Sequence, residues 1–111
     1  MSACRCITPP FHRDDFESEA IGIDMTNLRF GEVSVETCKA CGSKWLQYFV
    51  EYEAFTASGR YFRGIASLEQ LQGLTPERAA TVLADMTWYF RGGSYYRTPG
   101  ERASGLPHVD L

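Results

Sequence analysis

The sequence predicts an α+β domain in which a small antiparallel sheet of three to four strands carries one packed C-terminal helix. Residues 44–55 alternate their side chains between two faces, which is typical of a strand. Residues 76–91 place apolar side chains at helical spacing. Because the strands precede the helix along the chain, this order indicates the α+β class. At 111 residues the chain is predicted to form a single domain, 1–111.

The composition is that of a globular protein, with 44% hydrophobic and 23% charged residues. The net charge of −3 gives the molecule no overall attraction to nucleic acid or to an anionic membrane. No apolar run approaches the length of a transmembrane helix, and the first residues contain no hydrophobic signal core. We therefore expect a cytoplasmic protein whose cysteines stay reduced.

The first part of the chain is predicted to contain a connector and two strands. Residues 8–20 are proline-led and acidic, which indicates a loop or extended connector within an N-terminal segment, 1–20. Residues 21–25 are predicted as a short strand and residues 28–38 as a longer one. The apolar alternation of the longer strand changes phase across Gly31, as a β-bulge would cause it to do.

The middle of the chain is predicted to form a β-hairpin. The strand over residues 44–55 ends in a turn that uses Gly59, and residues 61–66 return as its partner strand. A short turn of helix is expected within residues 67–74.

The main helix is predicted over residues 76–91. Thr75 is a suitable N-cap, and Pro76 is suited to the first helical position. Gly92 suits the position that follows a helix C-terminus. Residues 98–111 contain several glycine and proline breaks and are expected to form an irregular tail.

The four cysteines of the chain fall into two close pairs. In the Cys-x-x-Cys-Gly pair the chain turns tightly, and Gly42 permits the bend, so both sulfurs can reach one metal ion. In the Cys-x-Cys pair, alternate residues of an extended strand point to the same side. Four thiolates at tetrahedral spacing suit Zn²⁺. The predicted ligands of one zinc ion per chain are Cys4, Cys6, Cys38 and Cys41. The ion is expected to tie the N-terminal segment, 1–20, to the rest of the domain.

The segment TCKACGSKW, residues 37–45, resembles one half of a zinc ribbon or of a rubredoxin-like zinc knuckle. Such families commonly use two Cys-x-x-Cys knuckles. Here the first pair is Cys-x-Cys, and 31 residues separate the two pairs. The resemblance is limited to this segment and the Cys4/Cys6 pair, and it implies a bound metal without implying an activity.

Several alternatives to a structural zinc site remain open at the level of sequence. The cysteines could form disulfides or stay as free thiols, or the same four thiolates could hold iron for electron transfer. His12 could replace Cys4 as a ligand if Cys4 were mobile. A catalytic Cys-x-x-Cys redox pair is disfavoured because a strand, not a helix, is predicted after the motif. If all four cysteines bind, no position is left for water, and a closed site of this kind is structural.

A second cluster combines arginines with aromatic residues, a pairing that is typical of binding surfaces. The predicted partner-binding residues are Arg60, Tyr61, Arg63, Arg91, Tyr95, Tyr96 and Arg97. In the alternative interpretation the aromatic rings complete the core while the arginines stay in water. The acidic segment over residues 14–19 is a competing contact surface for a basic partner.

We therefore expect a small non-catalytic zinc-binding protein, bacterial and cytoplasmic, that acts as a binding module of adaptor or immunity type. The acidic balance of the chain favours a protein partner over nucleic acid. Glu51 and Glu53 share a strand face, which solvation explains better than acid–base catalysis. The alternatives are an iron-binding electron-transfer protein of rubredoxin type and a metalloenzyme with an open metal position.

Overall fold

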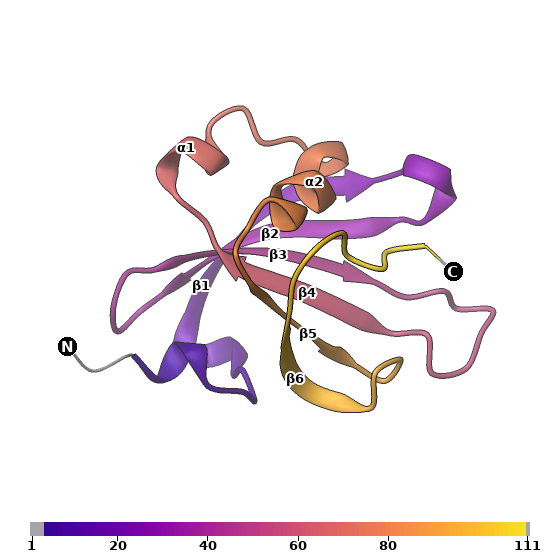
Figure 1. Ribbon diagram of the computed structural model, residues 1–111, viewed down its shortest axis with the longest axis horizontal. Coiled ribbons are helices and arrows are strands. Elements are labelled where there is room, and N and C mark those ends of the chain that lie inside the picture. The colour runs from indigo at the N-terminus through magenta and orange to yellow at the C-terminus, as the bar shows by residue number, and fades with distance from the viewer. Residues whose placement is uncertain (1–3, 111) are drawn as a thin grey trace.

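A computed structural model describes residues 4–110 as one open, six-stranded antiparallel sheet whose strands lie in sequence order (Figure 1). The α+β class is confirmed, but the expected three to four strands are too few. The strands are β1 (Phe16–Asp24), β2 (Gly31–Cys38), β3 (Lys44–Val50), β4 (Arg60–Ile65), β5 (Tyr89–Gly93) and β6 (Thr98–Ala103). Two short helices precede the sheet, η1 (Arg5–Ile7) and η2 (Arg13–Asp15). The helices between strands are η3 (Thr26–Leu28), α1 (Leu68–Leu71), η4 (Pro76–Arg78) and α2 (Ala79–Ala84).

The main helix begins where the sequence predicts but is much shorter than residues 76–91. Thr75 precedes a 3₁₀ turn that leads into α2, and α2 ends at Ala84. The remainder of the predicted helix forms β5, because consecutive aromatic residues favour a strand. Gly92 lies inside that strand against the ring of Tyr61, where a Cβ atom would come within 2.8 Å, so it does not terminate a helix. Within residues 4–110, no helix is long and apolar enough to cross a membrane.

Both edge strands include residues that the sequence predicts as irregular. β1 begins at Phe16, inside the expected connector 8–20, and is longer than the predicted strand 21–25. β6 occupies the first part of the predicted tail 98–111, where Tyr89 pairs with Ala103. Neither edge strand shows a clean apolar alternation, because at least half of its residues are exposed.

The turns also differ from the prediction. The irregularity in pairing lies in β1, between Ala20 and Gly22, and not at Gly31, where β2 begins. The change of phase that indicated a bulge arises because Leu28 and Phe30 belong to the β1–β2 turn. β3 ends at Val50, so the second half of the predicted strand 44–55 is loop.

The sheet carries apolar clusters on both faces. On one face α2 supplies Leu83, which packs with Leu46, Tyr48 and Phe62 in the larger cluster. On the other face the N-terminal segment packs against a smaller cluster that consists mainly of Trp45, other aromatic residues and two cysteines. Figure 1 shows α2 and the N-terminal segment on opposite sides of the sheet. The smaller cluster positions the cysteines.

Candidate metal centre

The structure brings all four predicted cysteine ligands together. Their Sγ atoms all lie within 4.8 Å of one another. The Sγ atoms of Cys4 and Cys38 are 3.8 Å apart, and those of Cys6 and Cys41 are 3.6 Å apart. Each contact joins the N-terminal segment to the β2–β3 turn, so the cluster links two parts of the chain that are distant in sequence.

Short backbone hydrogen bonds shape the knuckle between β2 and β3. The amide of Gly42 donates to the Cys38 carbonyl at 2.9 Å, and the amide of Cys38 donates to the Ser43 carbonyl at 2.9 Å. Gly42 has a φ of +77°, which is unfavourable for other residues, so the expected role of this glycine is confirmed. The Lys39 amide donates to the Asp15 carbonyl at 3.0 Å, which fastens the knuckle to the N-terminal segment.

The first cysteine pair reaches the cluster in a different conformation from the one predicted. Cys4 and Cys6 do not lie on an extended strand. Cys6 belongs to η1, and the Ile7 amide donates to the Cys4 carbonyl at 3.2 Å. A tight 3₁₀ turn therefore aligns the two thiols, as the knuckle does for the second pair.

The spacing of the sulfur atoms suits a tetrahedral metal ion. Zinc–sulfur bonds of about 2.3 Å place neighbouring sulfurs about 3.8 Å apart in a regular tetrahedron. The Cys4–Cys38 and Cys6–Cys41 distances of 3.8 and 3.6 Å are close to that value. All four cysteines are free thiols. The arrangement is therefore compatible with a metal ion bound by four cysteines.

The four sulfurs differ in their exposure to solvent. Cys6 and Cys38 are buried, with exposed fractions of 5% and 3%, whereas Cys41 is exposed. Burial raises the pKa of the Cys6 thiol to about 12. The hydroxyl of Ser43 lies 3.2 Å from Cys41 Sγ and, together with the Ser43 amide, lowers the pKa of Cys41 to about 6. One side of the cluster is thus open to solvent while the other faces the aromatic rings.

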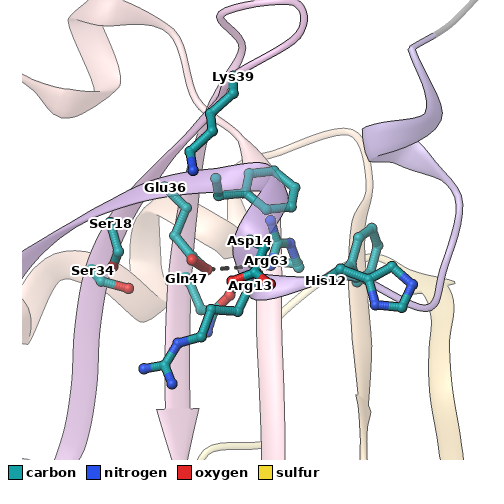
Figure 2. Close-up of a pocket in the computed structure, with 11 residues that line it drawn as sticks. His12, Arg13, Asp14, Ser18, Ser34, Glu36, Lys39, Gln47 and Arg63 are labelled. Carbon is teal, nitrogen blue, oxygen red and sulfur yellow. Dashed lines mark hydrogen bonds and ion pairs between the residues drawn. The ribbon is translucent and has the colours of Figure 1, made fainter.

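The cations nearest to the cysteines in sequence are Arg5, Lys39 and Lys44, and they are only partly available to offset thiolate charge. Arg5 forms an ion pair of 2.8 Å with Asp15. The ammonium group of Lys44 donates to the Thr37 hydroxyl at 3.2 Å. Lys39 extends toward a hollow beside the knuckle (Figure 2).

This hollow has a volume of about 440 Å³ and contains the buried side chain of Arg63 (Figure 2). Arg63 donates to Gln47 Oε1 at 2.8 Å and to Glu36 Oε1 at 3.3 Å. Its guanidinium carbon lies 4.4 to 5.0 Å from the ring centroids of Phe11, Phe16 and Trp45. Sequence reasoning missed the roles of Glu36 and Gln47, although Gln47 lies directly opposite Arg63 on neighbouring strands. Arg63 fixes the N-terminal aromatic rings against the sheet.

The predicted partner-binding residues do not form one exposed patch. Arg60 is fully buried and packs against Tyr52 and Tyr95 on the α2 side of the sheet. Arg63, with an exposed fraction of 4%, lies on the opposite face. The remaining members are Tyr61 (half-buried, with its hydroxyl donating to the Pro99 carbonyl), Arg91 and Tyr96 (half-buried), and Tyr95 and Arg97 (exposed). Side chains alternate between the two faces of a strand, so Arg60 and Arg63, three positions apart on β4, point to opposite faces of the sheet. The predicted patch is divided for this reason.

Comparison with known proteins gives no match among protein-family models, curated proteins or solved structures. The chain's own cysteine geometry therefore carries the functional assignment.

Proposed function

We propose that the protein is a zinc-binding domain in which one Zn²⁺ ion has a structural role. The observation that carries this proposal is the convergence of four sulfur atoms within 4.8 Å of one another, with two pairs at 3.6 and 3.8 Å, close to the spacing in a tetrahedral metal site. Four thiolates favour zinc over metals that prefer oxygen ligands. With Cys4, Cys6, Cys38 and Cys41 all bound, the ion keeps no open position for water or substrate, as is usual for structural zinc.

We further propose that the domain is a non-catalytic, cytoplasmic module that binds another protein. Four reduced thiols are compatible with the cytoplasm, and the net charge of −3 does not favour nucleic acid. Large apolar side chains are exposed at the end of the sheet that lies away from the cysteines. Exposed apolar clusters of this kind are typical of protein-binding surfaces.

Elemental analysis and native mass spectrometry of the protein purified under reducing conditions test the metal. We expect one zinc per chain, which is lost when acid protonates the thiolates. Cys6→Ser and Cys38→Ser should each lose most of the zinc. His12→Ala is the matched control and should keep it, because His12 is exposed and lies outside the cysteine cluster.

Three results would overturn this assignment. A disulfide between two of the cysteines in protein kept under reducing conditions would exclude the site. A coloured protein containing iron in place of zinc would indicate a rubredoxin-type electron carrier. An exchangeable water on the bound metal would indicate an open site of the kind that metalloenzymes use.

A further inference from the structure

Exposed apolar side chains gather at the end of the sheet opposite the cysteines. Five large residues form this group, which we call the apolar end: Ile23, Met25, Leu28, Phe30 and Phe55. They come from the last part of β1, the β1–β2 turn and the β3–β4 loop, which project from the same end of the sheet (Figure 1). Leu28 and Phe30 have exposed fractions of 72% and 59%. Clustered exposure of this kind is unusual in a globular protein and marks an interaction surface.

The apolar end is hollowed on both sides of Phe30. One hollow of about 430 Å³ is lined by Ile23 and Phe49, and another of about 420 Å³ by Leu28 and Phe55. Phe30, Glu51 and Glu53 line both. The two hollows therefore adjoin, and each offers apolar walls to a large side chain of a partner.

The free charges around the two hollows are acidic. Glu32, Glu51 and Glu53 line them and are exposed. Arg29 is the only cationic residue in either lining, and it is buried in ion pairs of 2.7 Å with Asp24 and 3.0 Å with Asp110. Arg29 therefore offers little charge to a ligand, and the surface favours a partner that carries positive charge.

The turn that presents Leu28 and Phe30 holds an unfavourable backbone conformation. Asn27, Leu28 and Phe30 have φ values of 56°, 59° and 53°, in the left-handed region that bulky residues rarely adopt. Core packing does not explain this conformation, because both apolar side chains point into solvent. Asp24 maintains the turn by accepting hydrogen bonds from the Thr26 amide and from Arg29. Strain that is maintained in this way is typical of functional segments.

We propose that the apolar end is the partner-binding surface and that it takes a basic, apolar protein segment, with large apolar side chains flanked by lysine or arginine. The apolar residues of the segment occupy the two hollows beside Phe30, and its cations lie against Glu32, Glu51 and Glu53. This proposal rests on the proposed function as a protein-binding module. The proposed surface differs from both surfaces that the sequence suggested. It is acidic and apolar, unlike the predicted arginine surface, and it does not include the acidic segment 14–19.

The test is a fluorescence-anisotropy titration of zinc-loaded protein with a labelled ten-residue peptide of alternating lysine and leucine. A glutamate–leucine peptide of the same length is the control ligand. We expect saturable binding of the cationic peptide, at least tenfold weaker binding of the acidic one, and a loss of affinity as salt is raised.

Two kinds of variant locate the binding surface. Leu28→Asn/Phe30→Asn removes the apolar side chains and introduces asparagine, which tolerates positive φ. Glu51→Lys/Glu53→Lys reverses the charge beside the hollows. Each should weaken binding of the cationic peptide at least tenfold. Leu106→Ser is the matched control, since Leu106 is also highly exposed but lies outside the apolar end, and it should bind as the unaltered protein does.

Several outcomes would overturn the proposal: no binding, equal binding of both peptides, or unchanged binding by the two double variants. Self-association that Leu28→Asn/Phe30→Asn abolishes, measured by sedimentation, would assign the surface to a second copy of the chain instead. Zinc content and circular dichroism are measured for every variant. Zinc-loaded, folded protein that does not bind would reject this surface alone, whereas protein without zinc would reject the proposed metal centre.

Discussion

The two ends of the β1–β2 hairpin are stabilised by different chemistry. At the end where β2 finishes, at Cys38, four thiols approach one another around a site that suits a metal ion. At the other end, roughly 23 Å away along β2 at the usual rise of a strand, a buried carboxylate organises the turn. Asp24 accepts hydrogen bonds from Arg29 Nε at 2.9 Å, Arg29 Nη2 at 2.7 Å and the Tyr48 hydroxyl at 2.8 Å. If the proposed ion binds, the first end depends on a component that can be removed, while the second is built from the chain alone.

Metal removal is expected to have the largest effect and to act at one end only. The proposed ion joins positions as far apart as Cys4 and Cys38, which are 34 residues apart. A cross-link that closes a loop of this length stabilises a fold by about 4 kcal/mol. Chelation, or Cys6→Ser, should lower the free energy of unfolding in urea by about this amount.

Hydrogen exchange shows where the structure opens. We expect loss of protection in residues 4–16 on chelation, with residues 24–30 and α2 unchanged, because the larger apolar cluster does not contain the cysteines. Loss of protection at both ends together would show that the metal organises the entire fold and that the two ends are not independent.

Asp24→Asn should have the next largest effect, about 3 kcal/mol, because it leaves the buried Arg29 without its main partner. Asp15→Asn is the matched control at the metal end. It breaks a pair in which the Arg5 side chain is 79% exposed, so we expect a loss below about 1 kcal/mol. Zinc content should stay at the level of the unaltered protein in both variants. Equal losses in the two variants would contradict the contrast between a buried and an exposed pair.

The effect of Asp24→Asn should depend on pH. Burial alone would raise the pKa of Asp24, but hydrogen bonds from Thr26, Tyr48 and Arg29 outweigh burial and lower it. A lowered pKa stabilises the folded protein fully above the unfolded-state pKa of about 3.9 and progressively less as the pH falls through the folded value. The stability difference between the unaltered protein and Asp24→Asn should therefore shrink below about pH 4.

Substitutions of two glycines, one at each end of the hairpin, are expected to give the smallest losses of stability and the most specific test of the difference between the ends. A Cβ atom at Gly31 would overlap the Tyr48 hydroxyl and displace it from Asp24, so Gly31→Ala should cost about 2 kcal/mol. Gly42→Ala should cost about 1 kcal/mol, because no atom lies within 4 Å of the added Cβ and only the φ of +77° opposes it.

A double-mutant cycle with Asp24→Asn then separates the two ends. Gly31→Ala should be less costly in that background, because Tyr48 has already lost its charged partner, whereas Gly42→Ala should be additive. Additivity at both glycines would mean that Gly31 does not act through Tyr48.

The cysteine cluster was predictable from the sequence because its chemistry is strongly constrained. Two close thiol pairs in a reduced protein have few stable uses, so their distance along the chain matters little. Gly42 was predictable for a similar reason, since a knuckle requires a sharp bend after its second cysteine. The 3₁₀ turn at Cys6 was not, because an extended strand and a tight turn can both align two neighbouring thiols.

The strand β5 was not predictable because its residues satisfy two patterns. Met86 and Phe90 continue the helical stripe, yet Tyr89 and Phe90 also suit the two faces of a strand. Pairing with β4 decides between them, and this pairing is not local. The apolar end was missed for another reason. Leu28 and Phe30 look like strand residues, because an apolar pattern does not reveal whether a side chain is covered.

The order of the strands has a consequence for how quickly the molecule assembles. Each strand pairs with its neighbour in sequence, and only the connection from β4 to β5 contains α-helices. Most of the sheet can therefore form through short loop closures, which are fast. The thiols instead join segments 34 and 35 residues apart, a contact that only a largely assembled sheet can hold in place. An ion that binds after the rate-limiting barrier leaves the folding rate almost unchanged and acts by slowing unfolding, so it extends the lifetime of the folded chain.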